Sequence, residues 1–118
     1  ETLRDHRRSR WEHVKAAAVL AWNDRFDAGR RAHAARLSLG NVSIVHLPGE
    51  PFVEYQLHAQ RARPDHFVCV AGYGDCGMWY VPIDAAYHEA GGYEQSWAFG
   101  RPCEAGLKWA IDELLSRV

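Results

Sequence analysis

Residues 42–72 are patterned as a strand, a helix and a second strand, and this unit restricts the fold of the chain more than any other feature. The run VSIVHL at 42–47 is apolar and ends at Pro48-Gly49. PFVEYQLHAQRA at 51–62 predicts a helix, and HFVCVAGYG, a continuous apolar run closed by glycines, predicts a buried strand at 66–72. Because strands joined by a helical crossover pair in parallel, we expect both strands in one sheet.

A hairpin adds an antiparallel strand to this unit. Ala35, Leu37 and Leu39 alternate with polar residues, and Gly40-Asn41 is a two-residue turn in which both residues tolerate positive φ. We therefore expect strands at 32–39 and 42–47. The predicted fold class is α/β: a mixed sheet with flanking helices, built from a β-hairpin plus the strand–helix–strand unit.

Helical periodicity is expected on both sides of the sheet region. Residues 3–28 predict a helix that ends at Gly29, so the chain is divided into an N-terminal helix (1–31) and residues 32–118, within a length of 118 residues that fits one domain overall. WYVP predicts a short strand, and IDAAYHEA predicts a brief helix opened by Pro82. Residues 91–102 are expected to be a loop or an extended segment. In the helix at 51–62, the helical spacing is that of Phe52, Val53, Gln56, Leu57 and Gln60. The last helix is expected to be amphipathic, with one face made of Leu107, Ala110, Ile111, Leu114 and Leu115.

Composition bears on nucleic-acid binding, on membrane spans and on the chemistry of the cysteines. The net charge of −1 gives no electrostatic reason to expect nucleic-acid binding. No apolar stretch approaches the roughly 20 residues of a transmembrane helix. The three cysteines have no zinc-knuckle spacing; Cys69 is expected as a buried thiol, and a Cys76–Cys103 disulfide stays open. The compartment is not assigned.

Glu50 is the most informative polar residue, because it follows a strand and lies between Pro48 and Pro51. Sites gather beyond the carboxyl ends of parallel strands. The second glycine-rich exit is AGYGDCGMWY, so Glu50, Tyr73, Asp75 and Tyr80 are expected to converge if the two strands are neighbours. A carboxylate held by two prolines suits a metal ligand or a general base. The alternative is an acid that favours the dipole of the following helix.

The segments LSLGNVSIVHLPGEPFVEY, GYGDCGMWYVP and GGYE, taken in order, resemble the last part of the catalytic domain of neutral ceramidases. These zinc-dependent amidases hydrolyse the amide of N-acylsphingosine, and the resemblance covers residues 32–118. It implies that Glu50 and Tyr80 are zinc ligands and that Tyr93 stabilises the oxyanion of the amide intermediate. Pro82 stands where the family has a threonine, and the residues before Tyr80 differ from the family pattern.

Zinc catalysis usually needs three protein ligands and a water, and Glu50 with Tyr80 supplies two. The zinc histidines of the family lie upstream, and residues 1–31 do not resemble them. The resemblance therefore implies a segment of a larger α/β domain, with histidines supplied by the rest of the parent enzyme or by a second subunit, and a lipid amide as substrate. Two alternatives stay open: a non-catalytic structural or interaction module, and a self-sufficient hydrolase completed by His46, Asp75 or a second subunit.

Overall fold

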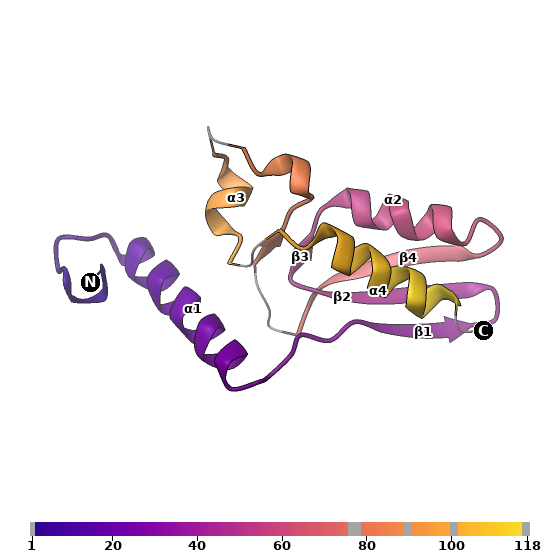
Figure 1. Cartoon of the computed structure of the whole chain (residues 1–118), viewed down its shortest axis with the longest axis horizontal. Coiled ribbons are helices and arrows are strands. Elements are labelled where there is room, and N and C mark those ends of the chain that lie inside the picture. Colours follow the sequence, from indigo (N-terminus) through magenta and orange to yellow (C-terminus); the bar gives the residue numbers. More distant parts are fainter. Residues whose placement is uncertain (1, 76–78, 89–90, 100–101, 117–118) are drawn as a thin grey trace. The chain divides into compact units, whose positions relative to one another are not determined.

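The computed structural model describes residues 2–75, 79–88, 91–99 and 102–116 (Figure 1). The chain divides into two compact units, Glu1–Arg31 and Ala32–Val118. The first unit contains the short 3₁₀ helix η1 (Thr2–Arg4) and the helix α1 (Arg10–Asp27). The second unit contains the sheet and the remaining helices.

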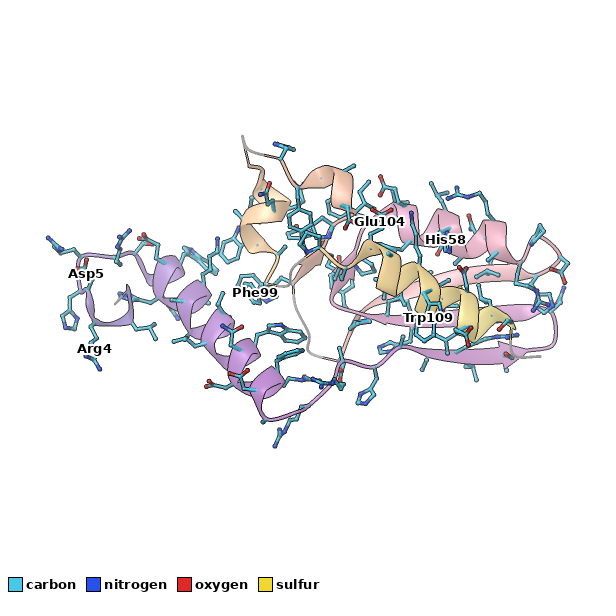
Figure 2. All side chains as sticks on the ribbon, viewed as in Figure 1. Arg4, Asp5, His58, Phe99, Glu104 and Trp109 are labelled. Atoms are coloured by element: carbon cyan, nitrogen blue, oxygen red, sulfur yellow. The ribbon has the colours of Figure 1, made fainter. Side chains whose placement is uncertain are left out.

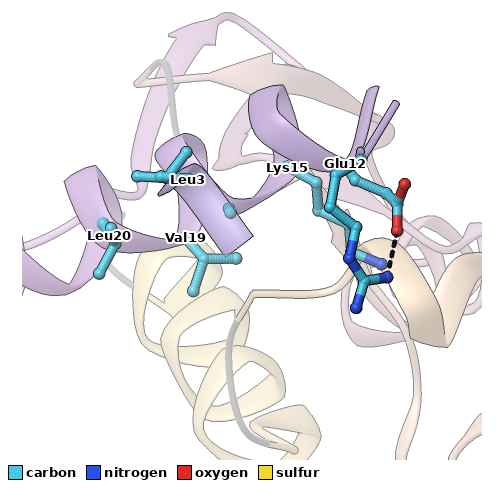
Figure 3. A pocket seen from close by; sticks show the side chains of 7 residues that line it. Leu3, Glu12, Lys15, Val19 and Leu20 are labelled. Atoms are coloured by element: carbon cyan, nitrogen blue, oxygen red, sulfur yellow. Dashed lines mark hydrogen bonds and ion pairs between the residues drawn. The ribbon is translucent and has the colours of Figure 1, made fainter. Parts of the chain in front are cut away.

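Helix α1 begins at Arg10, later than the predicted start at residue 3, because Ser9 caps it. The Ser9 hydroxyl accepts a hydrogen bond from the Glu12 backbone N–H at 3.2 Å, and the Glu12 carboxylate accepts one from the Ser9 N–H at 2.9 Å. This reciprocal pair is a capping box. A hollow of about 490 Å³ in this unit is lined by apolar residues that include Leu3, Val19 and Leu20, and by the ion-paired Arg8 and Glu12 (Figure 3).

The second unit has the predicted mixed sheet, so the α/β assignment is confirmed. Strand β2 (Val42–Pro48) lies between β1 (Ala35–Leu39) and β4 (Phe67–Gly74), antiparallel to the first and parallel to the second. Strand β1 starts three residues later than predicted, and β4 runs two residues further, to Gly74. A second parallel pair joins β3 (Glu50–Pro51) to β5 (Tyr80–Val81).

Helices α2 (Val53–Ala62) and α4 (Glu104–Ser116) cover one face of the three-stranded sheet (Figure 1). Ile111 and Leu115 are buried, and Leu107 and Leu114 pack against the core, as the predicted face of α4 requires. The core has contributions from the sheet, from both helices and from β5: Val45, Leu47, Tyr55, Ala59, Val68, Val81, Ile111 and Leu115.

Helix α2 is present as its spacing predicts, and the residues that it buries lie between the spaced positions. Val53 and Leu57 are 64% and 44% exposed, whereas Tyr55 and Ala59 are fully buried. Burial of Tyr55 is possible because its hydroxyl donates a 3.0 Å hydrogen bond to the Pro82 carbonyl. Gln56 turns to the outer edge of β4, where its amide donates to the Val68 carbonyl at 3.0 Å and accepts from the Val70 N–H at 2.5 Å.

Residues 91–102 are expected to be a loop or an extended segment, but the structure places a five-residue helix within them, α3 (Tyr93–Trp97). The Trp79 ring, next to β5, lies 4.5 Å from the Trp97 ring and 4.7 Å from the Phe99 ring between centroids. This aromatic contact holds the short helix beside β5. The brief helix expected after Pro82 is the 3₁₀ turn η2 (Asp84–Ala86).

Charged side chains hold both ends of α4. The Glu104 carboxylate accepts a 2.7 Å hydrogen bond from the Asp84 N–H. Arg36 donates to the Leu114 carbonyl at 3.0 Å, and Arg63 donates to the Leu115 carbonyl at 2.9 Å. Cations at these positions satisfy carbonyls that the last helical turn leaves unpaired.

The other face of the sheet exposes apolar side chains. Leu39, Val42 and Phe67 form one row across the three strands, and Leu37, Ile44 and Cys69 form the next. Leu37, Leu39 and Phe67 are 55%, 59% and 66% exposed. Cys69, expected as buried, is half-buried on this face; Cys69 and Cys103 are free thiols, and Cys76 lies outside the described residues.

Candidate functional site

Glu50 is held by the backbone on both sides. Gly49, with φ of +70°, turns the chain after β2, and its N–H donates to the Gly74 carbonyl at 3.2 Å. The Glu50 N–H donates to the Trp79 carbonyl at 2.6 Å, and Glu50 pairs in register with Tyr80. The ends of β2 and β4 are thus joined, and Glu50 lies against the strand that contains Tyr80.

Tyr80 and Tyr93 meet edge to face. Their ring centroids are 5.8 Å apart with an interplanar angle of 71°, a favourable aromatic geometry. Tyr93 is the first residue of α3, and its side chain is 65% exposed. The structure therefore brings the three residues named from the resemblance, Glu50, Tyr80 and Tyr93, into one place.

Tyr73 also belongs to this group. A hydrogen bond to Glu50, and then the negative charge of Glu50, raise the pKa of the Tyr73 hydroxyl. Burial, and then the same charge, raise the pKa of Tyr80. Both phenols are protonated at neutral pH, so both hydroxyls can donate hydrogen bonds.

Two other candidates have different surroundings. A carboxylate oxygen of Asp75 accepts a 3.2 Å hydrogen bond from the His33 N–H. The His46 imidazole packs on Gly74, where an added Cβ would lie 1.7 Å from His46 Nε2. In the described part of the chain, no three His, Cys, Asp or Glu side chains are grouped to hold a metal ion.

The helix-dipole interpretation applies to another residue. Helix α2 begins at Val53 with Phe52 as its N-cap, and the acid in its first turn is Glu54. Glu50 instead belongs to β3, paired with β5. The dipole effect falls off within the first turn, so it does not account for the position of Glu50.

The donor groups of this site include the Glu50 carboxylate and the hydroxyls of Tyr73, Tyr80 and Tyr93. Carboxylate oxygen is a common zinc ligand, and phenol hydroxyls can donate to negative charge that develops on a substrate oxygen. Glu50 and Tyr80 fit zinc as part of a ligand set, but at least one further ligand is needed. A site with this composition also suits binding of a polar carbonyl group.

The left-handed backbone of Tyr73 was not predicted from sequence, although Tyr73 was placed at this edge of the sheet. The signal is the sequence Gly72-Tyr73-Gly74, since a side chain between two glycines at a strand end marks a change of backbone direction. The backbone confirms such a change, because Tyr73 has φ of 59°.

A separate hollow of about 500 Å³ lies between α4 and the segment before β1. Its lining includes His33, Leu107, Trp109 and Leu114, and Trp109 is 65% exposed (Figure 2). None of Glu50, Tyr80 and Tyr93 is part of this lining.

Comparisons with protein-family models, with curated proteins and with solved structures give no match for this chain. None of the described helices combines the length and the apolar character that a membrane span requires.

Proposed function

We propose that residues 32–118 contribute part of the catalytic site of a zinc-dependent amidohydrolase similar to the neutral ceramidases, acting on an N-acylsphingosine-like amide. Glu50 and Tyr80 would hold the metal, and Tyr93 would donate to the oxyanion. The observation that supports this best is the pairing of Glu50 with Tyr80, with the Tyr93 ring 5.8 Å from the Tyr80 ring.

The chemistry of each residue fits its proposed role. Zinc, when bound, acidifies a water and polarises the amide carbonyl. Glu50 offers an anionic oxygen whose backbone is fixed by β3 and β5, which limits its displacement. Burial, and then the charge of Glu50, raise the pKa of Tyr80, so its hydroxyl is neutral before a metal binds. Tyr93, largely exposed, is accessible to a substrate.

Histidine ligands would come from the rest of the parent enzyme or from a second subunit, since Glu50 and Tyr80 are two of the three or more ligands that zinc requires. The experiment is elemental mass spectrometry of the 118-residue chain and of the longest natural polypeptide that contains it. We expect zinc in the long form, and less of it after Glu50→Ala or Tyr80→Phe. Unchanged zinc occupancy in both variants would refute the proposal.

The second candidate is a non-catalytic structural or interaction module. The observation that favours it is the exposed apolar face of the sheet, with Leu37, Leu39 and Phe67 all more than half exposed. Sedimentation in the presence and absence of a chelator separates the two candidates. A stable dimer indifferent to metal favours the module, and a monomer that responds to metal favours the amidohydrolase.

A further inference from the structure

Strand β1 has a described strand partner on one side only. In the order β1–β2–β4 it lies at the edge of the three-stranded sheet, antiparallel to β2 (Figure 1). At the opposite edge, the Gln56 side chain is bonded to the β4 backbone at Val68 and Val70. The β1 side is therefore the side of this sheet to which a further strand can be added.

The hairpin decides which backbone groups of β1 point outward. Its turn is Gly40-Asn41, so the flanking residues Leu39 and Val42 form a hydrogen-bonded pair. Along an antiparallel ladder, such pairs alternate with pairs that exchange no hydrogen bonds. Ser38, paired with Ser43, is of the second kind. The N–H and C=O of Ser38 therefore point away from β2, toward the outer edge.

The usual protections of an edge strand are missing from β1. Natural edges are protected by proline, by lysine or by a bulge. Ala35–Leu39 contains no proline and no lysine, and its register with β2 is continuous. Its charged side chain, Arg36, is turned to α4, where it donates to the Leu114 carbonyl at 3.0 Å. Leu37 and Leu39 are 55% and 59% exposed beside this edge.

We propose that β1 is an interface between two copies of this chain, with the two β1 strands antiparallel about a two-fold axis at Ser38. The two Ser38 residues then exchange both of their backbone hydrogen bonds. On the open face of the sheet, Leu37 of each copy lies beside Leu39 of the other. Arg36 lies at the level of Gly40 of the other copy, so no like charges meet. A two-fold interface requires a patch that is complementary to itself in this way.

The size of this interface predicts a weak dimer. Five residues a side are well below the roughly 20–30 residues a side of a standard protein interface. The association should therefore depend on protein concentration. The inference is independent of the proposed function, because β1 contains none of Glu50, Tyr80 and Tyr93. Zinc content remains the test of that function, so the two can fail separately.

The first test is sedimentation of the 118-residue chain over a range of concentrations. We expect a monomer at low concentration and a dimer at high concentration. Ser38→Pro removes the outward N–H, at an edge position where proline leaves the β1–β2 hydrogen bonds in place, and should abolish the dimer. Ser38→Ala is the matched control: it removes only the hydroxyl and should dimerise as the wild type does.

Three results would overturn the proposal. They are a wild-type chain that is monomeric at every concentration, a Ser38→Pro chain that still dimerises, and a Ser38→Ala chain that does not. If circular dichroism shows that Ser38→Pro has lost its fold, Ser38→Lys replaces it. Two lysines would then meet across the axis, and a dimer that persists in Ser38→Lys would also refute the pairing.

A second test determines how the strands are arranged, in a background with alanine at positions 69, 76 and 103. A mixture of Leu37→Cys and Leu39→Cys chains should form a mixed disulfide faster than either chain cross-links alone. Phe67→Cys is the control: Phe67 is 66% exposed on the same face, but the two β4 strands would be about 24 Å apart, five strand spacings. Equal rates for the mixture and the single chains, or rapid cross-linking of Phe67→Cys, would refute pairing through β1.

Discussion

At the scale of single residues, the site depends on close approaches that leave no room for larger side chains. Gly74 is the clearest case, since an added Cβ would lie 1.7 Å from His46 Nε2. The His46 ring would have to move, and Gly74 is bonded through its carbonyl to Gly49, next to Glu50.

Gly74→Ala should therefore destabilise the protein, and most of the loss should disappear in a His46→Ala background. A double-mutant cycle in denaturant should give a coupling energy in the range of about 0.5–3 kcal/mol. Gly106→Ala is the control: nothing lies within 4 Å of its added Cβ, and alanine in a helix interior gains up to about 1 kcal/mol. Additive losses for Gly74 and His46 would contradict the packing described.

Glu104 gives a prediction on pH. Its hydrogen bond with Lys108, and then its bond with the Asp84 backbone, lower the pKa of the carboxyl from its ordinary value of 4.5. A lowered folded-state pKa contributes stability above about pH 4.5, and this contribution is lost as pH falls through the folded-state pKa. Glu104→Gln should reduce the loss of stability between pH 7 and pH 3, measured by denaturant unfolding.

Lys108→Met removes the main cause of the shift and should reduce the same pH dependence. Part of the pH dependence of stability should remain in both variants, because Arg63 also lowers the pKa of Asp65. An unchanged pH dependence in Glu104→Gln would contradict the assignment.

At the scale of elements, α1 depends on local interactions, because none of its side chains is buried. Ser9→Ala removes half of the capping box and should cost about 1 kcal/mol of helix stability. Amide exchange of residues 10–27 should accelerate accordingly. Ser9→Asp should preserve slow exchange, since aspartate also caps; equal exchange in the alanine variant and the wild type would contradict the role of the cap.

Elements defined by local pattern were predicted well, and those defined by distant partners were not. Short-range sequence signals predict the hairpin turn at Gly40-Asn41 and the crossover helix. These two connections together predict the mixed sheet. The burial of Tyr55 in α2 could not be predicted in this way, because it depends on a bond to the Pro82 carbonyl, a partner that periodicity cannot reveal. Helix α3 was missed because a helix of five residues is too short to show a period.

The same division applies to the candidate site. Glu50 was located from its prolines and its strand, which are local features. The register that sets Glu50 beside Tyr80 depends on two strands of two residues each. Such short strands carry no alternation, so the pairing itself had no signal in the sequence.

At the scale of the whole molecule, the described core belongs to residues 32–118 alone. A chain of these residues, without residues 1–31, should therefore fold and unfold in one cooperative transition. Its thermal midpoint should lie within a few degrees of the full chain, since no buried core residue is removed. Calorimetry of both chains tests this, and a broad transition in the shorter chain would contradict it.

The amide of Gln56 has a consequence for assembly. The outer edge of a sheet offers unpaired backbone groups to any strand that approaches, which is how polymers and amyloid grow. At β4 the Val68 carbonyl and the Val70 N–H are already bonded to one side chain that imitates a peptide group. An incoming strand would have to displace Gln56 first, so growth by strand addition is obstructed at this edge.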